Sequence, residues 1–250
     1  MKSHSVSPQR RRRFLKLAGT AGALLAAGHL PSPARAADAA GKVKIGVIGS
    51  GRIGSTLGGV WAKTGHEVMF SSRHIENDRR LAAELGGNAR AGTPREAAAF
   101  GEALLIAVPY RALPEVGKDL GGLVKGKIVL DACNPIPSRD GEIATWAREK
   151  GAGIASAELL PGARIVRAFN AIGYARMGAA HEQKGERIGM PIAGDDAKAI
   201  EIASRLIREI GYEPVLIGGL AMGKYLMPGT PLAGERTPDE IRKIAATLKG

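Results

Sequence analysis

A glycine-rich turn between an apolar strand and a helix constrains the fold of this chain more than any other feature. Gly49-Ser50-Gly51-Arg52-Ile53-Gly54 has the spacing G-x-G-x-x-G, follows the apolar run 43–48 and opens a helix predicted over 52–63. In that context the first glycine permits a tight turn, the second lets a pyrophosphate approach the backbone, and the third brings the helix close to the sheet. The turn therefore predicts a dinucleotide-binding site; a glycine turn with a packing role alone is the alternative.

Short apolar runs alternate with longer amphipathic segments over residues 42–250. Strands are predicted at 43–48, 67–71, 103–108, 127–131, 164–169, 188–193 and 213–217. Helices are predicted at 52–63, 76–85, 110–123 (whole or broken), 142–150, 156–160, 196–210 and 238–248. Asp195 and Thr237 are the candidate N-caps of the last two helices. The alternation indicates an α/β fold, a Rossmann-type doubly wound and mainly parallel sheet in a single domain with a short α/β C-terminal extension.

The amino terminus has the layout of an export signal. A basic start, Arg10 to Lys16, precedes the mildly apolar stretch 17–30 and the small-x-small sequence Ala34-Arg35-Ala36. Arg11-Arg12-x-Phe14-Leu15-Lys16 resembles the twin-arginine export motif. We therefore expect the twin-arginine machinery to export the chain to the periplasm, with cleavage after Ala36. The alternative is a basic arm that binds nucleic acid or lipid.

The domain division follows from this layout, with a cleaved signal peptide at 1–36, a nucleotide-binding domain at 42–226 and a C-terminal segment at 227–250 that ends in a helix. The chain holds 36 Lys and Arg against 24 Asp and Glu, and seven of the basic residues lie in the signal. The remainder lacks the lysine stripe and interleaved aromatic residues of a nucleic-acid binder. No apolar run reaches about 18 residues, so no permanent membrane span is expected.

Ligand types for metals and disulfides are scarce. Cys133 is the single cysteine, which excludes an intramolecular disulfide and any CxxC motif. After cleavage the histidines are His66, His74 and His181, at no metal-ligand spacing, so no metal is expected.

The end of the second predicted strand selects the cofactor. Proteins that prefer NAD place an acidic residue there, about twenty residues beyond the glycines, to accept from the ribose 2′-hydroxyl. This chain has Ser71-Ser72-Arg73-His74 instead, and no carboxylate before Glu76. Hydroxyls can donate to a 2′-phosphate and a guanidinium can pair with it, so NADP is expected rather than NAD. The alternative is a solvated arginine in a surface loop.

Four further loops should gather at the carboxyl ends of the strands, where open α/β sheets bind ligands. They are Val108-Pro109-Tyr110, 132–135, 169–171 and 218–220. Asn134 and Asn170 are candidates for contacts to the nicotinamide carboxamide or to substrate, or they form turns by local hydrogen bonds. Tyr110 is expected to pack at a helix start, and Cys133 to be a small buried residue rather than a nucleophile. No catalytic acid, base or nucleophile is assigned, because hydride transfer requires mainly proximity and orientation.

Several of these segments together resemble a known family, the reductases that shuttle hydride between NADP and the deazaflavin coenzyme F420. The segments are 43–54, 71–73, 108–109, 131–135 and 166–170. The same module resembles the amino-terminal domain of pyrroline-5-carboxylate reductases. The resemblance implies that the phosphates lie over the glycine turn, that Ser72 and Arg73 face the 2′-phosphate, and that a flat deazaflavin stacks on the nicotinamide. It also implies a homodimer.

The expected function is an exported NADP-dependent oxidoreductase that moves hydride between NADP(H) and a planar small-molecule acceptor, a deazaflavin or flavin. A non-catalytic dinucleotide-binding or sensing module is the alternative, and an exported basic surface binder is a third. The sequence leaves the physiological acceptor and the direction of transfer open.

Overall fold

A computed structural model describes residues 41–178, 180 and 185–249, so the predicted signal peptide lies outside the described residues. In that part eight strands form one sheet in the order β3-β2-β1-β4-β5-β6-β7-β8. They are β1 Lys44–Ile48, β2 Glu67–Ser71, β3 Ala89–Ala91, β4 Ala103–Ile106, β5 Ile128–Asp131, β6 Arg164–Arg167, β7 Gly189–Gly194 and β8 Glu213–Leu216. All neighbours pair in parallel except β6 and β7, which are antiparallel. The predicted Rossmann-type, mainly parallel α/β fold is confirmed.

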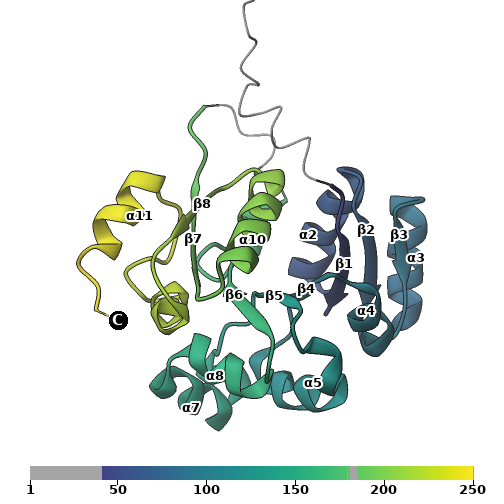
Figure 1. Cartoon of the computed structure of the whole chain (residues 1–250), viewed down its shortest axis with the longest axis horizontal. Coiled ribbons are helices and arrows are strands. Elements are labelled where there is room, and N and C mark those ends of the chain that lie inside the picture. Colours follow the sequence, from purple (N-terminus) through teal and green to yellow (C-terminus); the bar gives the residue numbers. More distant parts are fainter. Residues whose placement is uncertain (1–40, 179, 181–184, 250) are drawn as a thin grey trace, which may run out of the picture. The chain divides into compact units, whose positions relative to one another are not determined.

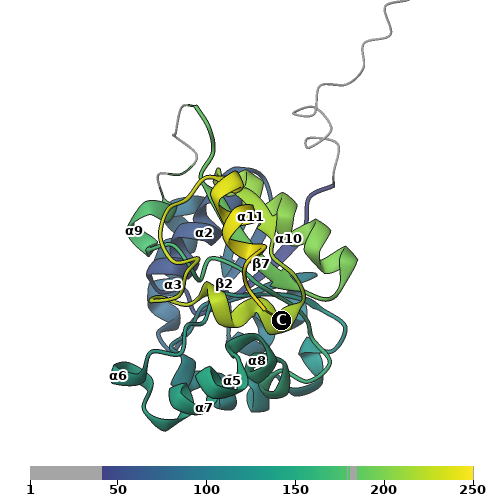
Figure 2. The same cartoon turned by 90° about the vertical axis from the view of Figure 1, so that its left-hand side faces the viewer.

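Helices cover both faces of the sheet (Figure 1). One face carries α2 Arg52–Lys63, α3 Ile75–Leu85 and α10 Ala197–Ile210. The other carries α4 Pro94–Phe100, α5 Leu113–Leu120, α7 Glu142–Lys150 and α8 Ala152–Leu159. A third apolar cluster joins β8 to the last helix, α11 Pro238–Ala245, which lies beside β7 and β8 (Figure 2). None of the helices in the described ranges is long and apolar enough to cross a membrane.

Short helical turns occupy the loops. They are η1 Tyr110–Ala112, η2 Gly121–Val124, α6 Pro137–Asp140, α9 Tyr174–Met177 and η4 Leu220–Leu226. The predicted helix over 110–123 is therefore broken into η1, α5 and η2.

The helix after the glycine turn is fixed against the sheet by one buried face. Leu57 and Trp61 on α2 are fully buried, and burying side chains of this size contributes about 1.5–3 kcal/mol each. The Trp61 indole N–H donates to the Leu206 carbonyl oxygen at 2.9 Å, which ties α2 to α10. A Cβ atom at Gly58 would lie 2.5 Å from the Phe70 ring, so α2 can approach β2 this closely only with glycine there. These contacts set the position of the helix amino terminus, where the predicted site begins.

The structure corrects one of the two predicted N-caps and adds two elements besides the short helical turns. Asp195 is not the N-cap of α10; Asp196 is, because its side chain accepts from the Ala199 amide at 2.8 Å, while Asp195 accepts from the Leu220 amide. Thr237 is confirmed as the N-cap of α11. The added elements are β3, whose short Ala-Arg-Ala run has no apolar pattern, and α4, which starts at a Thr93–Glu96 capping box.

Candidate cofactor site

The first and third glycines of the turn are required by backbone geometry. Gly49 has φ +98°, in the left-handed region, and an added Cβ atom would lie 2.6 Å from the Ala107 carbonyl oxygen. A Cβ atom at Gly54 would lie 2.1 Å from the Gly49 carbonyl oxygen. The amides of Gly49 and Ser50 both donate to the Ser71 carbonyl oxygen, at 2.9 and 3.1 Å. The turn is therefore fixed between the ends of β1, β2 and β4.

The middle glycine has no such packing role. A Cβ atom at Gly51 would meet no other atom within 4 Å, so this backbone faces open space. Within the described chain, no acceptor bonds to the amides of Arg52, Ile53 or Gly54. The first turn of α2 contains no acidic residue, and no side chain caps it. A helix start with unused amides beside an open glycine fits a diphosphate.

The serines after β2 have other hydrogen-bond partners in this structure. The Ser71 side chain is fully buried and its hydroxyl donates to the Val47 carbonyl oxygen at 2.7 Å, so it supports the turn from beneath. The Ser72 hydroxyl donates to Asp78 Oδ2 at 2.8 Å and accepts from the His74 amide at 3.0 Å. Arg73 is exposed at the same edge and forms no ion pair in the described ranges.

Asp78 also belongs to this region, although no sequence motif predicts it. Its side chain is 1% exposed and accepts from the hydroxyls of Ser50 and Ser72. It forms no ion pair with any described residue, but it lies near the start of α3, where the helix dipole favours an anion. Asp78 and Ala82 are the buried residues of α3, and this i, i+4 spacing marks the face of the helix that meets the sheet.

A pocket of about 670 Å³ opens where the parallel strands end. Several predicted site residues line it: Gly51, Arg52, Ile53, Val108, Pro109, Asn134 and Asn170. Others do not line it and belong to the turn or to the edge after β2: Gly49, Ser50, Gly54, Ser71, Ser72 and Arg73. The structure thus gathers three of the four predicted loops, while 218–220 contributes nothing to the lining.

Ile136 and Arg139, just beyond the predicted loop 132–135, also line the pocket. Two further segments of its wall were not predicted: 172–174, which continues the predicted loop 169–171, and Pro228, Gly229, Ala233 and Gly234 from the chain beyond residue 226. The Gly234 amide donates to the Ala171 carbonyl oxygen at 2.8 Å, and Arg176 pairs with Glu235 at 2.6 Å. The two segments therefore form one continuous wall.

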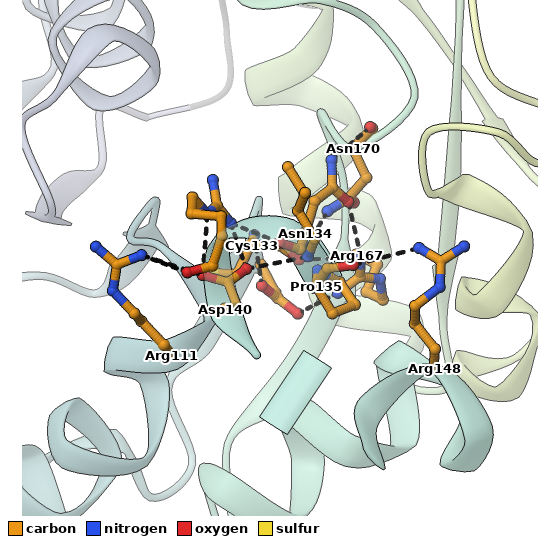
Figure 3. Close-up of polar contacts among 11 residues, drawn as sticks. Arg111, Cys133, Asn134, Pro135, Asp140, Arg148, Arg167 and Asn170 are labelled. Carbon is orange, nitrogen blue, oxygen red and sulfur yellow. Dashed lines mark hydrogen bonds and ion pairs between the residues drawn. The ribbon is translucent and has the colours of Figure 1, made fainter. Parts of the chain in front are cut away.

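A buried ion pair orients the asparagines (Figure 3). Arg167 and Asp131 are both fully buried, and Arg167 Nη1 donates to Asp131 Oδ2 at 2.7 Å. Arg167 Nη2 also donates to the Cys133 carbonyl oxygen at 3.1 Å and lies 3.4 Å from Asn134 Oδ1. Asn134 Nδ2 in turn donates to the Asn170 carbonyl oxygen at 2.8 Å. The carboxamide of Asn134 is thus fixed on both sides.

Asn170 Oδ1 is a buried acceptor that no donor in the described ranges reaches. Because buried polar atoms are nearly always hydrogen-bonded in native proteins, this one suits a ligand N–H group in the pocket. Phe169, next to it, has φ +66°, an unfavourable conformation for a bulky side chain. Its ring is 1% exposed and packs edge-on against Trp61, with centroids 6.3 Å apart. Such a strained residue held by packing is typical of ligand sites.

Two arginines, Arg52 and Arg139, line the pocket, and no acidic side chain of the described residues does. Arg139 donates to the Asn134 carbonyl oxygen at 2.7 Å and pairs with Asp140 at 2.7 Å. Burial acts to raise the pKa of Asp140, but hydrogen bonds from Arg139 and a backbone amide outweigh it and lower the pKa. The Arg52 guanidinium lies 4.9 Å from the Tyr174 ring centroid and donates to its hydroxyl. This lining suits an anionic ligand.

The thiol and phenol nearest to the loops are buried. Cys133 is 1% exposed, its Sγ lies 3.4 Å from the Ile106 carbonyl oxygen, and burial raises the pKa of the thiol. Burial also raises the pKa of Tyr110, whose hydroxyl lies 3.2 Å from that of Ser156. Both interpretations as packing residues are confirmed.

The fold and the glycine turn define a Rossmann-type dinucleotide-binding domain. Residues 44–135 match the model of a family described as NADP oxidoreductase, coenzyme F420-dependent. This segment is therefore similar to the NADP-binding domain of the F420-dependent NADP oxidoreductases.

Similar proteins share this domain at distant identity. The F420-dependent NADP reductase of Methanothermobacter thermautotrophicus is 29% identical over 206 residues, which cover 76% of this chain and 87% of the relative. The metalloreductase STEAP3 of Rattus norvegicus is 28% identical over 72% of this chain, but the match spans only 35% of the relative. The crystal structure of a hypothetical protein from Sinorhizobium meliloti has a TM-score of 0.67 at 24% identity, covering 79% of this chain and 96% of that one. The structural match shows the fold alone.

Proposed function

We propose that this protein transfers hydride between NADP(H) and a planar acceptor, a deazaflavin or a flavin. One observation carries the proposal: unused amides at the start of α2 face open space beside Gly51. The similarity to the F420-dependent NADP reductase of Methanothermobacter thermautotrophicus supports it as well.

In the proposed complex the amides at Gly51, Arg52 and Ile53 bind the diphosphate. Arg73 lies at the edge after β2, where the adenosine ribose binds in this fold, and pairs with the 2′-phosphate. NADPH, when bound, supplies the hydride. Val108, Pro109 and Asn134 border its nicotinamide ring, and Asn170 Oδ1 accepts from the carboxamide N–H group. Hydride transfer requires mainly proximity and orientation, so these residues act by orientation rather than by proton transfer.

The glycine turn gives the first test. In Gly51→Ala the new Cβ atom meets no protein atom, so we expect the melting temperature to be unchanged and NADPH binding to be lost or strongly weakened. Gly59→Ala is the matched control on the same helix, because its Cβ atom makes an ordinary 3.6 Å contact with Leu85. Calorimetric titration with NADPH measures both variants. Equal binding by Gly51→Ala and the control would contradict the proposed phosphate site.

Arg73 gives the second test. Arg73→Ala should weaken NADPH by about 1.5–3 kcal/mol, the contribution of a hydrogen bond to a charged group, and leave NADH nearly unchanged. Arg79→Ala, on the exposed side of α3, is the control for a general loss of positive charge. Equal losses of affinity for NADPH and NADH would show that Arg73 does not contact the 2′-phosphate.

Turnover distinguishes the two candidate functions. We expect NADPH oxidation with a deazaflavin or a flavin under steady-state conditions. Tight NADPH binding with no turnover on either acceptor would favour the dinucleotide-sensing module instead.

We also propose export and dimerisation, which rest on the sequence and on the resemblance. The processed protein should begin at Ala37 and appear in the periplasm, as intact mass measurement would show. Replacing both Arg11 and Arg12 with Lys should block export. If the unaltered protein itself remains unprocessed in the cytoplasm, the proposed export is wrong. Light scattering of the processed protein tests for a homodimer.

A further inference from the structure

We propose that Asp78 is a specificity-determining residue: it turns the hydroxyls of Ser50 and Ser72 into acceptors at the ribose and so limits the preference for NADP over NAD. This inference rests on the proposed function, because it requires a nicotinamide dinucleotide at the glycine turn.

The two serines lie on both sides of the expected ribose position. Ser50 is the second residue of the glycine turn, and Ser72 directly follows β2. In Rossmann-type domains the adenosine ribose lies between these two segments, and the residue at the end of β2 contacts its 2′ position. Both side chains are only partly buried, so a ligand can reach them.

The hydrogen bonds fix the direction in which each hydroxyl donates. A serine hydroxyl has a single hydrogen and two acceptor lone pairs, whereas an ionised carboxylate only accepts. Ser50 Oγ bonds to Asp78 Oδ1, and Ser72 Oγ bonds to Asp78 Oδ2. Both hydroxyl hydrogens therefore point to Asp78. Towards a ligand the two hydroxyl oxygens can therefore only accept. Ser72 already uses one of its lone pairs to accept from the His74 amide.

The burial of Asp78 keeps this arrangement in place. The side chain is 1% exposed, and within the described chain no cation lies at ion-pair distance from it. If either serine turned its hydrogen towards a phosphate, a buried carboxylate oxygen would lose its donor, which costs free energy. The serines thus remain acceptors when the nucleotide binds.

The chemistry of the ligand then decides the preference. A ribose 2′-hydroxyl can donate to a serine oxygen, whereas a 2′-phosphate needs donors and is repelled by the nearby carboxylate. Arg73 attracts the phosphate and Asp78 opposes it. We therefore expect the protein to bind NADH as well as NADPH, with a preference smaller than Arg73 alone would give.

Nucleotide titrations of Asp78→Asn test the idea. The asparagine side chain accepts from one serine and donates to the other, so one hydroxyl hydrogen becomes available and the negative charge is removed. The ratio of the dissociation constants for NADH and NADPH should rise about tenfold in favour of NADPH. Glu76→Gln, an exposed change on the same helix, removes a charge without touching the serines and should leave the ratio unchanged. An unchanged ratio in Asp78→Asn, or a shift towards NADH, would overturn the proposal.

Ser72→Ala provides a second test that does not require Asp78→Asn to fold. Loss of an acceptor should weaken NADH severalfold more than NADPH. A selective loss of NADPH affinity would show that the hydroxyl donates to the 2′-phosphate, and would overturn the inference. If the unaltered protein binds neither nucleotide, the proposed function itself fails; if it binds both and neither variant changes the ratio, only the role of Asp78 fails.

Discussion

Two buried aspartates beside the site differ in what neutralises them. Asp131, at the end proposed for the nicotinamide, is fully buried and paired with the equally buried Arg167. Asp78, at the end proposed for the adenosine, is 1% exposed and accepts only from two hydroxyls in the described structure. The first arrangement cancels the charge and the second leaves it in place.

This difference predicts different roles for Asp131 and Asp78. Arg167 bridges β5 and β6 and bonds to the Cys133 carbonyl oxygen, so the pair at Asp131 fixes the framework under the pocket. Asp78 instead orients the hydroxyl hydrogens of Ser50 and Ser72 towards itself, so it affects what these hydroxyls can offer to a ligand. We therefore expect Asp131 to contribute mainly to the stability of the fold, and Asp78 to influence which nucleotide binds.

Removing Arg167 should have the largest effect. Arg167→Met leaves Asp131 buried without its cation, and breaking such a pair costs about 3–5 kcal/mol. Urea unfolding measured by circular dichroism gives the free energy. The double variant Asp131→Leu with Arg167→Met removes both charges and should recover most of the loss. A loss below about 1 kcal/mol in the single variant would erase the distinction between the two aspartates.

Asp78→Asn should destabilise the fold less. Its two donors are neutral hydroxyls, and the asparagine keeps one acceptor and gains a donor, so we expect a loss of about 1 kcal/mol. The same urea experiment measures it. A loss as large as that of Arg167→Met would show that Asp78 also has a framework role.

The partly buried pair of Arg164 and Asp196 should show the smallest effect. Hydrogen bonds from Arg164 and the Ala199 amide lower the pKa of Asp196 to about 2. Because the folded pKa lies below the ordinary value of 3.8, the pair contributes stability above that value and loses it as the pH falls through about 2. The unfolding midpoint should fall over this range, and it should fall less steeply in Asp196→Asn. Identical slopes would contradict the assignment.

The sequence predicts the strands of this fold well where apolar runs are long and flanked by turns. The apolar run 103–108 predicts β4 and its first residue, and the strand is buried throughout, as a central parallel strand requires. The strand itself ends at Ile106, two residues before the predicted end. The sequence does not predict the direction of β7. Its antiparallel pairing with β6 depends on the path of the connecting segment rather than on side-chain periodicity. The short β3 depends on pairing with β2 and has no pattern of its own.

The site follows the same division. The glycine turn and the loops at Asn134 and Asn170 are predictable because sequence motifs and strand ends place them. The role of Asp78 is not predictable in this way, because its burial depends on how α3 packs against the sheet. The position of 228–234 in the pocket wall is likewise not predictable from the sequence, because its contact with Ala171 joins segments about sixty residues apart in the chain.

The wall formed by 171–174 and 228–234 has a consequence for how such proteins diversify. The family match ends at residue 135, before this wall begins. In the proposed complex, the residues at the diphosphate and the adenosine ribose come from the matched segment, whereas this wall comes from a later stretch of the chain. We therefore expect substitutions in the wall to alter the choice of acceptor more than the binding of the nucleotide.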